Sequence, residues 1–75
     1  MKLGKYLSSL TKPELEELKP KLNLTDDEEI VFDQLAKGRS RVQIANKCNI
    51  SCSTVSNRTK AIKDKISRIE GIEFE

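Results

Sequence analysis

Apolar residues recur every three or four positions along most of the chain, the spacing that places them on one face of an α-helix. The first such stretch predicts a short helix, which Gly4 weakens. Its apolar positions are Leu3, Tyr6, Leu7 and Leu10. Four further stretches with this period follow. We therefore expect an all-α protein, a small bundle of four to five helices that contains a helix-turn-helix.

The second predicted helix begins at a capping box, in which Thr11 and Glu14 bond to each other's backbone N–H groups. It runs through Leu15 and Leu18. We expect it to stop before Pro20, because a proline pushes the preceding residue out of the α region.

The third predicted helix begins at the same kind of pair, Thr25 with Glu28. It ends at Gly38, since glycine is the usual residue just past a helix C-terminus. The residues expected to face inward are Val31, Phe32 and Leu35.

Residues 40–66 carry the most distinctive pattern, a short helix, a four-residue turn and a longer basic helix. Ser40 with Gln43 caps the short helix, which runs through Cys48 with Ile44 and Ala45 inward. Asn49 suits the turn because asparagine tolerates the left-handed conformation, and Ile50 then fills the corner. This pattern predicts a helix-turn-helix, whose second helix enters the major groove of DNA.

The last predicted helix begins after Ser51, a capping residue, and ends at Gly71. Residues 52–69 form its recognition segment. The residues expected to face inward are Val55, Ile62, Ile66 and Ile69.

Positive charge is concentrated in one part of the chain. Residues 39–68 carry eight lysines and arginines against one aspartate, a net charge of +7. Residues 1–23, 24–38 and 69–75 carry +2, −4 and −3. Because surfaces that bind phosphate are cationic, this concentration on the helix-turn-helix favours a nucleic-acid partner.

Composition argues against most other classes. With 75 residues, 36% hydrophobic and 4% aromatic, the chain has room for one small aliphatic core, so no small-molecule ligand is expected. It contains no histidine, and two cysteines cannot complete a zinc site. Cys48 is interpreted as a small core residue and Cys52 as a partly exposed thiol. No metal is expected.

No acid–base set and no glycine-rich phosphate loop occurs in the sequence. We therefore expect neither an enzyme nor a cofactor. The longest apolar run is three residues and the N-terminus lacks a secretory signal, so the sequence predicts no membrane partner and a cytoplasmic location.

A set of residues between Leu24 and Ile66 repeats the pattern of a known family. They are Leu24-Thr25, Glu28, Val31, Leu35-Ala36, Gly38, Ser40, Ile44-Ala45, Ile50-Ser51, Thr54-Val55, Ile62 and Lys65. On these residues the chain resembles the LuxR/GerE-type helix-turn-helix family, and shares a helical outline with region 4 of bacterial sigma factors. The chain departs from the family at four positions. Ile30 stands where the family usually has an acidic residue. Cys48, Asn49 and Arg58 stand where the family has Leu, Gly and commonly His.

Helix geometry and the resemblance together predict the DNA contacts. The predicted base readers lie on the outward stripe of the last helix, and the resemblance favours Ser56, Asn57 and Lys60. The full set of predicted base readers is Ser53, Ser56, Asn57 and Lys60. The predicted phosphate contacts are Arg41, Gln43, Ser51, Thr54, Arg58 and Lys63. Lys65 and Arg68 are interpreted as solubilising residues.

The chain is divided into an N-terminal helical extension (1–23), a DNA-binding domain (24–69) and an acidic tail (70–75). The leucines of the extension are expected to pack on the motif, although they could instead pair two subunits as a homodimer. The predicted function is sequence-specific binding of double-stranded DNA by a bacterial or phage transcriptional regulator. Two alternatives stay open: a sigma-region-4-like adapter that contacts RNA polymerase, and a helical protein-interaction module.

Overall fold

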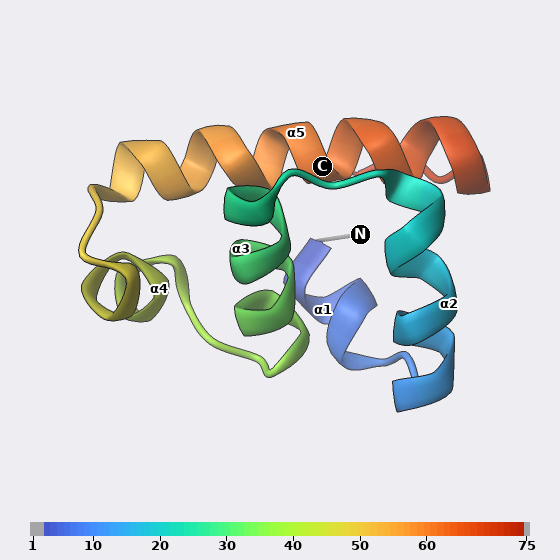
Figure 1. The fold of residues 1–75 in the computed structure, drawn as a ribbon, viewed down its shortest axis with the longest axis horizontal. Helices are drawn as coiled ribbons and strands as arrows, with labels where there is room; N and C mark the ends of the chain where they lie inside the picture. The colour runs from blue at the N-terminus through green and yellow to red at the C-terminus, as the bar shows by residue number, and fades with distance from the viewer. Residues whose placement is uncertain (1–2, 75) are drawn as a thin grey trace.

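Five helices make up the computed structural model, which describes residues 3–74. They are α1 (Leu3–Ser8), α2 (Lys12–Leu22), α3 (Asp26–Ala36), α4 (Arg41–Cys48) and α5 (Cys52–Glu70). Helix α5 runs along the long axis of the molecule, with the other helices on one side of it (Figure 1). Helix α4 lies under the start of α5, α2 under its end, and α1 and α3 between them. The all-α prediction is confirmed.

Local capping interactions set most helix boundaries. The three predicted capping boxes all form, Thr11 with Glu14, Thr25 with Glu28, and Ser40 with Gln43. Each satisfies N–H groups that the first helical turn leaves without partners. The prediction of these helix starts is therefore confirmed.

Left-handed residues end the helices of the motif. At the end of α3, Gly38 has φ +81°, its N–H donates to the Leu35 carbonyl (2.9 Å), and the Arg39 N–H donates to the Gln34 carbonyl (3.2 Å). These are the paired bonds of a Schellman cap, which favours glycine. Asn49 has φ +57° after α4, and Gly71 has φ +67° after α5. All three stops are confirmed.

The predicted end of α2 is wrong, because the helix continues through Pro20 to Leu22. Pro20 lies in the last turn, where it removes a single N–H donor, and Glu16, four residues before it, is exposed to water. Continuing the helix brings Leu22 beside Leu18 and buries both side chains. Asn23, at φ +50°, then ends the helix. Burial of Leu22 thus explains why α2 continues past Pro20, although a proline disfavours the α conformation of the residue before it.

One hydrophobic core joins all five helices. The leucines of α1 and α2 lie in the same cluster as the inward residues of α3, α4 and α5. The buried residues are Leu3, Leu7, Leu18, Leu22, Val31, Phe32, Leu35, Ile44, Ala45, Val55, Ile62 and Ile66. In this arrangement the leucines of residues 1–23 pack within the chain. The division into 1–23, 24–69 and 70–75 stays a prediction.

Ile69, predicted to face inward, is 45% exposed, so this prediction is wrong. It lies in the last turn of α5, which reaches past α2 (Figure 1). Periodicity places Ile69 near the inward side of the helix, but its side chain is left largely open to water.

The end of the chain folds back onto α1. The rings of Tyr6 and Phe74 meet edge to face, with centroids 5.6 Å apart and planes at 77°. Phe74 is half-buried against the core cluster. The segment after Gly71 is therefore packed on the helices up to Phe74, and Glu75, like Met1 and Lys2, lies outside the described residues.

Candidate nucleic-acid interface

Buried apolar residues hold α4 and α5 together around a short turn. Ile44 on α4 and Val55 on α5 are both fully buried, and Ile50 in the turn packs partly buried against the same cluster. The Ile50 N–H donates to the Ala45 carbonyl at 3.0 Å, which closes the turn after Asn49. Packing of this kind fixes the position of α5 relative to α4, as a helix-turn-helix requires.

One face of α5 is exposed and carries three of the four predicted base readers. Ser53, Asn57 and Lys60 are exposed and follow one another at the three- and four-residue spacing of a single helix face. The opposite face contains Val55 and Ile62, which are fully buried. Because burial of Val55 and Ile62 fixes the rotation of α5 about its axis, the three exposed side chains project away from the rest of the fold.

The fourth predicted base reader, Ser56, lies at the edge of that face and is half-buried. Its Oγ accepts a hydrogen bond from Arg41 Nη1 at 3.1 Å. Arg41 is the first residue of α4, so this bond joins the starts of the two helices. The structure thus brings one predicted base reader together with one predicted phosphate contact.

A shallow hollow of about 360 Å³ opens beside this bond, between α4 and α5. Leu35 and Val55 contribute its apolar lining. Among residues 3–74, its polar lining consists of Arg41, Ser56, Asn57, Thr59, Lys60 and Lys63. Arg41 and Lys60 bring positive charge to this lining, and positive charge attracts anions.

The start of α5 carries two further predicted phosphate contacts. Ser51 Oγ accepts from the Thr54 N–H at 3.1 Å, and the two hydroxyl oxygens lie 2.9 Å apart. The first turn of α5 contains no acidic residue, so nothing there neutralises the positive end of the helix dipole. In α4, Gln43 Oε1 accepts from the Ser40 N–H at 2.9 Å, which leaves the Gln43 amide N–H groups as donors.

Arg58 is placed differently from the other predicted phosphate contacts. Its Nη1 lies 3.4 Å from Asp27 Oδ1 on α3, and its side chain is 29% exposed. The arginine therefore lies on the flank of α5 that faces α3, within an ion pair. Arg58 is predicted as a phosphate contact from its place on α5 alone. Its partner Asp27 is 31 positions away, so the spacing within α5 does not reveal this ion pair.

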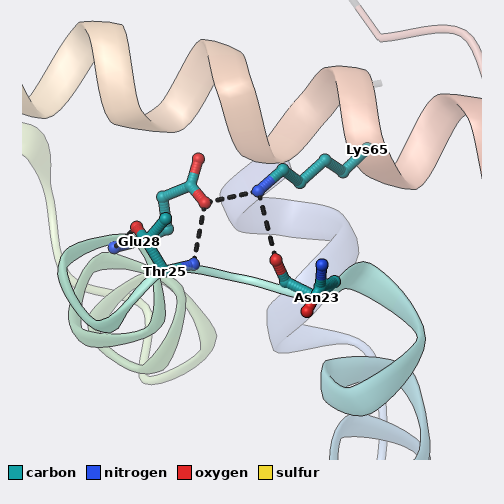
Figure 2. Close-up of polar contacts among 4 residues, drawn as sticks. All are labelled: Asn23, Thr25, Glu28 and Lys65. Carbon is teal, nitrogen blue, oxygen red and sulfur yellow. Dashed lines mark hydrogen bonds and ion pairs between the residues drawn. The ribbon is translucent and has the colours of Figure 1, made fainter.

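Lys65 is a structural residue, so its interpretation as solubilising is wrong. Its Nζ lies 2.5 Å from Glu28 Oε1 and 3.4 Å from the Asn23 carbonyl oxygen (Figure 2). The same Glu28 oxygen accepts from the Thr25 N–H at 3.0 Å. One lysine of α5 is thereby joined to the α2–α3 connection and to the cap of α3.

The Glu28 carboxylate is strongly favoured in this position. Its hydrogen bond with Lys65, and then its bond from the Thr25 backbone, lower the pKa of Glu28 below its ordinary value. A signal in the sequence could have revealed the pair, since Glu28 lies three and seven positions before the inward residues Val31 and Leu35. A carboxylate on an inward face needs a cation opposite it.

Among residues 3–74, no group of three or more potential ligands could hold a metal ion. Cys48 is half-buried against the core and Cys52 is exposed, both as free thiols, which matches their interpretation from the sequence. In the same range, none of the helices has the length and apolar character to cross a membrane.

Two helices locked around a tight turn, with an exposed polar and cationic face on the second, define a helix-turn-helix protein. A model of bacterial regulatory proteins of the LuxR family matches residues 22–68, more than half of the chain. The chain therefore belongs to the LuxR family of bacterial regulatory proteins, with a helix-turn-helix DNA-binding domain that serves transcription regulation. This match confirms the resemblance drawn from Leu24 to Ile66. No curated protein and no solved structure matches the chain.

Proposed function

We propose that this chain binds double-stranded DNA sequence-specifically in the cytoplasm of a bacterium, or of a bacterium infected by its phage, and regulates transcription there. The recognition segment of α5, within residues 52–69, enters the major groove. The observation that supports this most is the exposed stripe of Ser53, Asn57 and Lys60, on a helix whose opposite face is fully buried. A rigid polar face of this kind suits the reading of base edges.

Within this proposal, the exposed side chains divide into two roles. Asn57 can bond the N6 and N7 atoms of adenine, and Lys60 can reach O6 and N7 of guanine. Ser51 and Thr54, with the backbone N–H groups at the start of α5, contact one phosphate. Contacts to phosphates on either side of the groove fix the register of the recognition helix. The candidates for these are Arg41, Gln43 and Lys63.

A single module of this size contacts few base pairs, so useful affinity calls for a second copy or another tether. A homodimer on DNA is therefore part of the proposal. A contact with RNA polymerase, as in the adapter alternative, would use a different surface, and the exposed acidic residues Asp26 and Glu29 on α3 favour it.

The proposal is tested by fluorescence-anisotropy titration of a random duplex pool at several salt concentrations, followed by sequencing of the bound DNA. We expect the logarithm of the binding constant to fall linearly with the logarithm of salt concentration, because bound cations release counterions from DNA. Lys60→Ala should weaken binding and relax the preference at one base pair by about 1–3 kcal/mol.

The matched control is Lys12→Ala, which removes the same charge from the exposed start of α2, on the side of the molecule away from α5 (Figure 1). We expect it to leave the selected sequence unchanged. A folded wild-type chain that fails to bind duplex DNA at low salt would contradict the proposal and favour the protein-interaction alternative. Retention of the chain on purified RNA polymerase without DNA would favour the adapter.

The Asp27–Arg58 pair makes a separate prediction. In Asp27→Asn, Arg58 loses its partner and becomes available to a phosphate, so binding to the random pool should tighten and the salt dependence should steepen by up to about 0.9 in slope. Stability should change little, because exposed ion pairs contribute about 0–1 kcal/mol. The control is Asp26→Asn, which removes the same charge one position away, from a residue exposed at the start of α3. Equal effects of the two variants would show that net charge alone is responsible.

A further inference from the structure

The bond between Arg41 and Ser56 is a link between the two helices of the motif that the sequence pattern did not predict. Arg41 Nη1 donates to Ser56 Oγ at 3.1 Å, across 15 positions of sequence. Arg41 is itself exposed, at the start of α4, whereas Ser56 is half-buried. A long exposed arginine is thus held by a short side chain whose own position is set by α5.

The guanidinium that this bond holds has further donors to offer. An arginine side chain carries five N–H donors and no acceptor, and the bond to Ser56 uses one of them. Arg41 and Ser56 both line the cationic hollow between α4 and α5. Lys60 and Lys63 line it as well.

The hollow also adjoins the face that is proposed to read bases, since Asn57 and Lys60 contribute to both. A helix in the major groove is flanked by the phosphates of the two strands, so a cationic hollow at its edge lies where a backbone phosphate passes. Arginine binds phosphate through two parallel N–H bonds, which requires its planar group to be held in one orientation.

We infer that Ser56 is a positioning residue that reads no base: its hydroxyl orients Arg41, and Arg41 binds one backbone phosphate of DNA at the mouth of this hollow. The inference rests on the proposed DNA-binding function and revises the prediction that Ser56 contacts a base. Base reading from α5 is then carried by Ser53, Asn57 and Lys60.

The experiment compares Ser56→Ala, Arg41→Ala and the double variant by anisotropy titration on the random duplex pool and on a sequence selected by the wild-type chain. Ser56→Ala should weaken binding about twofold to tenfold on both, the range for one lost hydrogen bond. Arg41→Ala should weaken it further and lower the salt slope by about 0.9, the value for one phosphate. The double variant should bind like Arg41→Ala, because Ser56 acts only through Arg41.

Two controls separate positioning from a general structural effect. Ser56→Thr keeps the hydroxyl and should bind like the wild-type chain. Ser67→Ala removes a hydroxyl from the same helix three turns further on, outside the site, and should change neither affinity nor slope. Circular dichroism of each variant establishes that the helices are intact.

Each outcome decides the inference. Additive effects of the two single substitutions, or a change in the selected sequence with Ser56→Ala, would overturn it while the proposed function stands. A wild-type chain that is folded but does not bind DNA would overturn the proposed function and this inference with it. A non-additive double variant with an unchanged selected sequence would establish the positioning role.

Discussion

A Leu7→Ala substitution is expected to lower the free energy of unfolding by about 2–5 kcal/mol, the range for deleting a buried leucine. Leu7 is fully buried, in the cluster that also contains the inward residues of α3 and α5. Small domains have about 5 kcal/mol or somewhat more in total, so this loss removes a large fraction of the stability. Urea denaturation followed by circular dichroism at 222 nm measures it.

Ile69→Ala is the matched control, because it truncates an aliphatic side chain that is 45% exposed in the last turn of α5. Substitutions at such positions usually change stability by less than about 0.5 kcal/mol. If Leu7→Ala were no more destabilising than Ile69→Ala, α1 would not belong to the core. The comparison thus tests whether the first helix is a structural part of the domain.

The helices before the family match contribute to the core of the DNA-binding domain. The family match begins at residue 22, yet four leucines before or at that position are buried against the motif. They are Leu3, Leu7, Leu18 and Leu22. A helix-turn-helix of about 45 residues has little apolar surface to bury on its own. Helices α1 and α2 supply the missing layer, and α2 covers the second half of α5 (Figure 1).

Features of the fold that depend on neighbouring residues could be predicted from the sequence. Capping boxes form between residues three apart, and the left-handed turn residues Gly38, Asn49 and Gly71 act within one helix end. The inward faces of α3, α4 and α5 follow from periodicity over a few turns. These predictions needed no knowledge of what each helix packs against.

The errors arose where a distant part of the chain decides the outcome. Burial of Leu22 in the shared core carries α2 through Pro20, against the local preference of a proline. Ile69 has the right spacing for burial, yet its side chain in the last turn of α5 is 45% exposed. Neither fact is contained in the neighbouring sequence.

The candidate site divides in the same way. Exposure of Ser53, Asn57 and Lys60 follows from the period of α5 alone. By contrast, the partners of Ser56 and Arg58 lie on α4 and α3, and side-chain pairing between helices cannot be read from spacing within one helix. Lys65 was misread for the same reason.

Glu28→Gln is expected to lower the free energy of unfolding by about 1.5–3 kcal/mol at pH 7, the range for a hydrogen bond to a charged group. The substitution isolates the interaction with Lys65, because glutamine at this position can still complete the capping box with Thr25. Glu28 retains only 11% side-chain exposure, so water replaces the lost ion pair poorly. Glu16→Gln, at an exposed position of α2, controls for removal of one negative charge.

The difference between wild type and Glu28→Gln should also depend on pH in a defined direction. Glu28 has a pKa below its ordinary value of 4.5 in the folded chain, so the unfolded chain binds the proton more readily. Its contribution is therefore complete above about pH 5.5, declines as the pH falls through 4.5, and vanishes below the folded-state pKa. Urea midpoints of both proteins from pH 7 to pH 3 measure this difference. Other carboxylates titrate in both proteins alike, so a difference that persists unchanged to pH 3 would show that the ion pair with Lys65 is not its source.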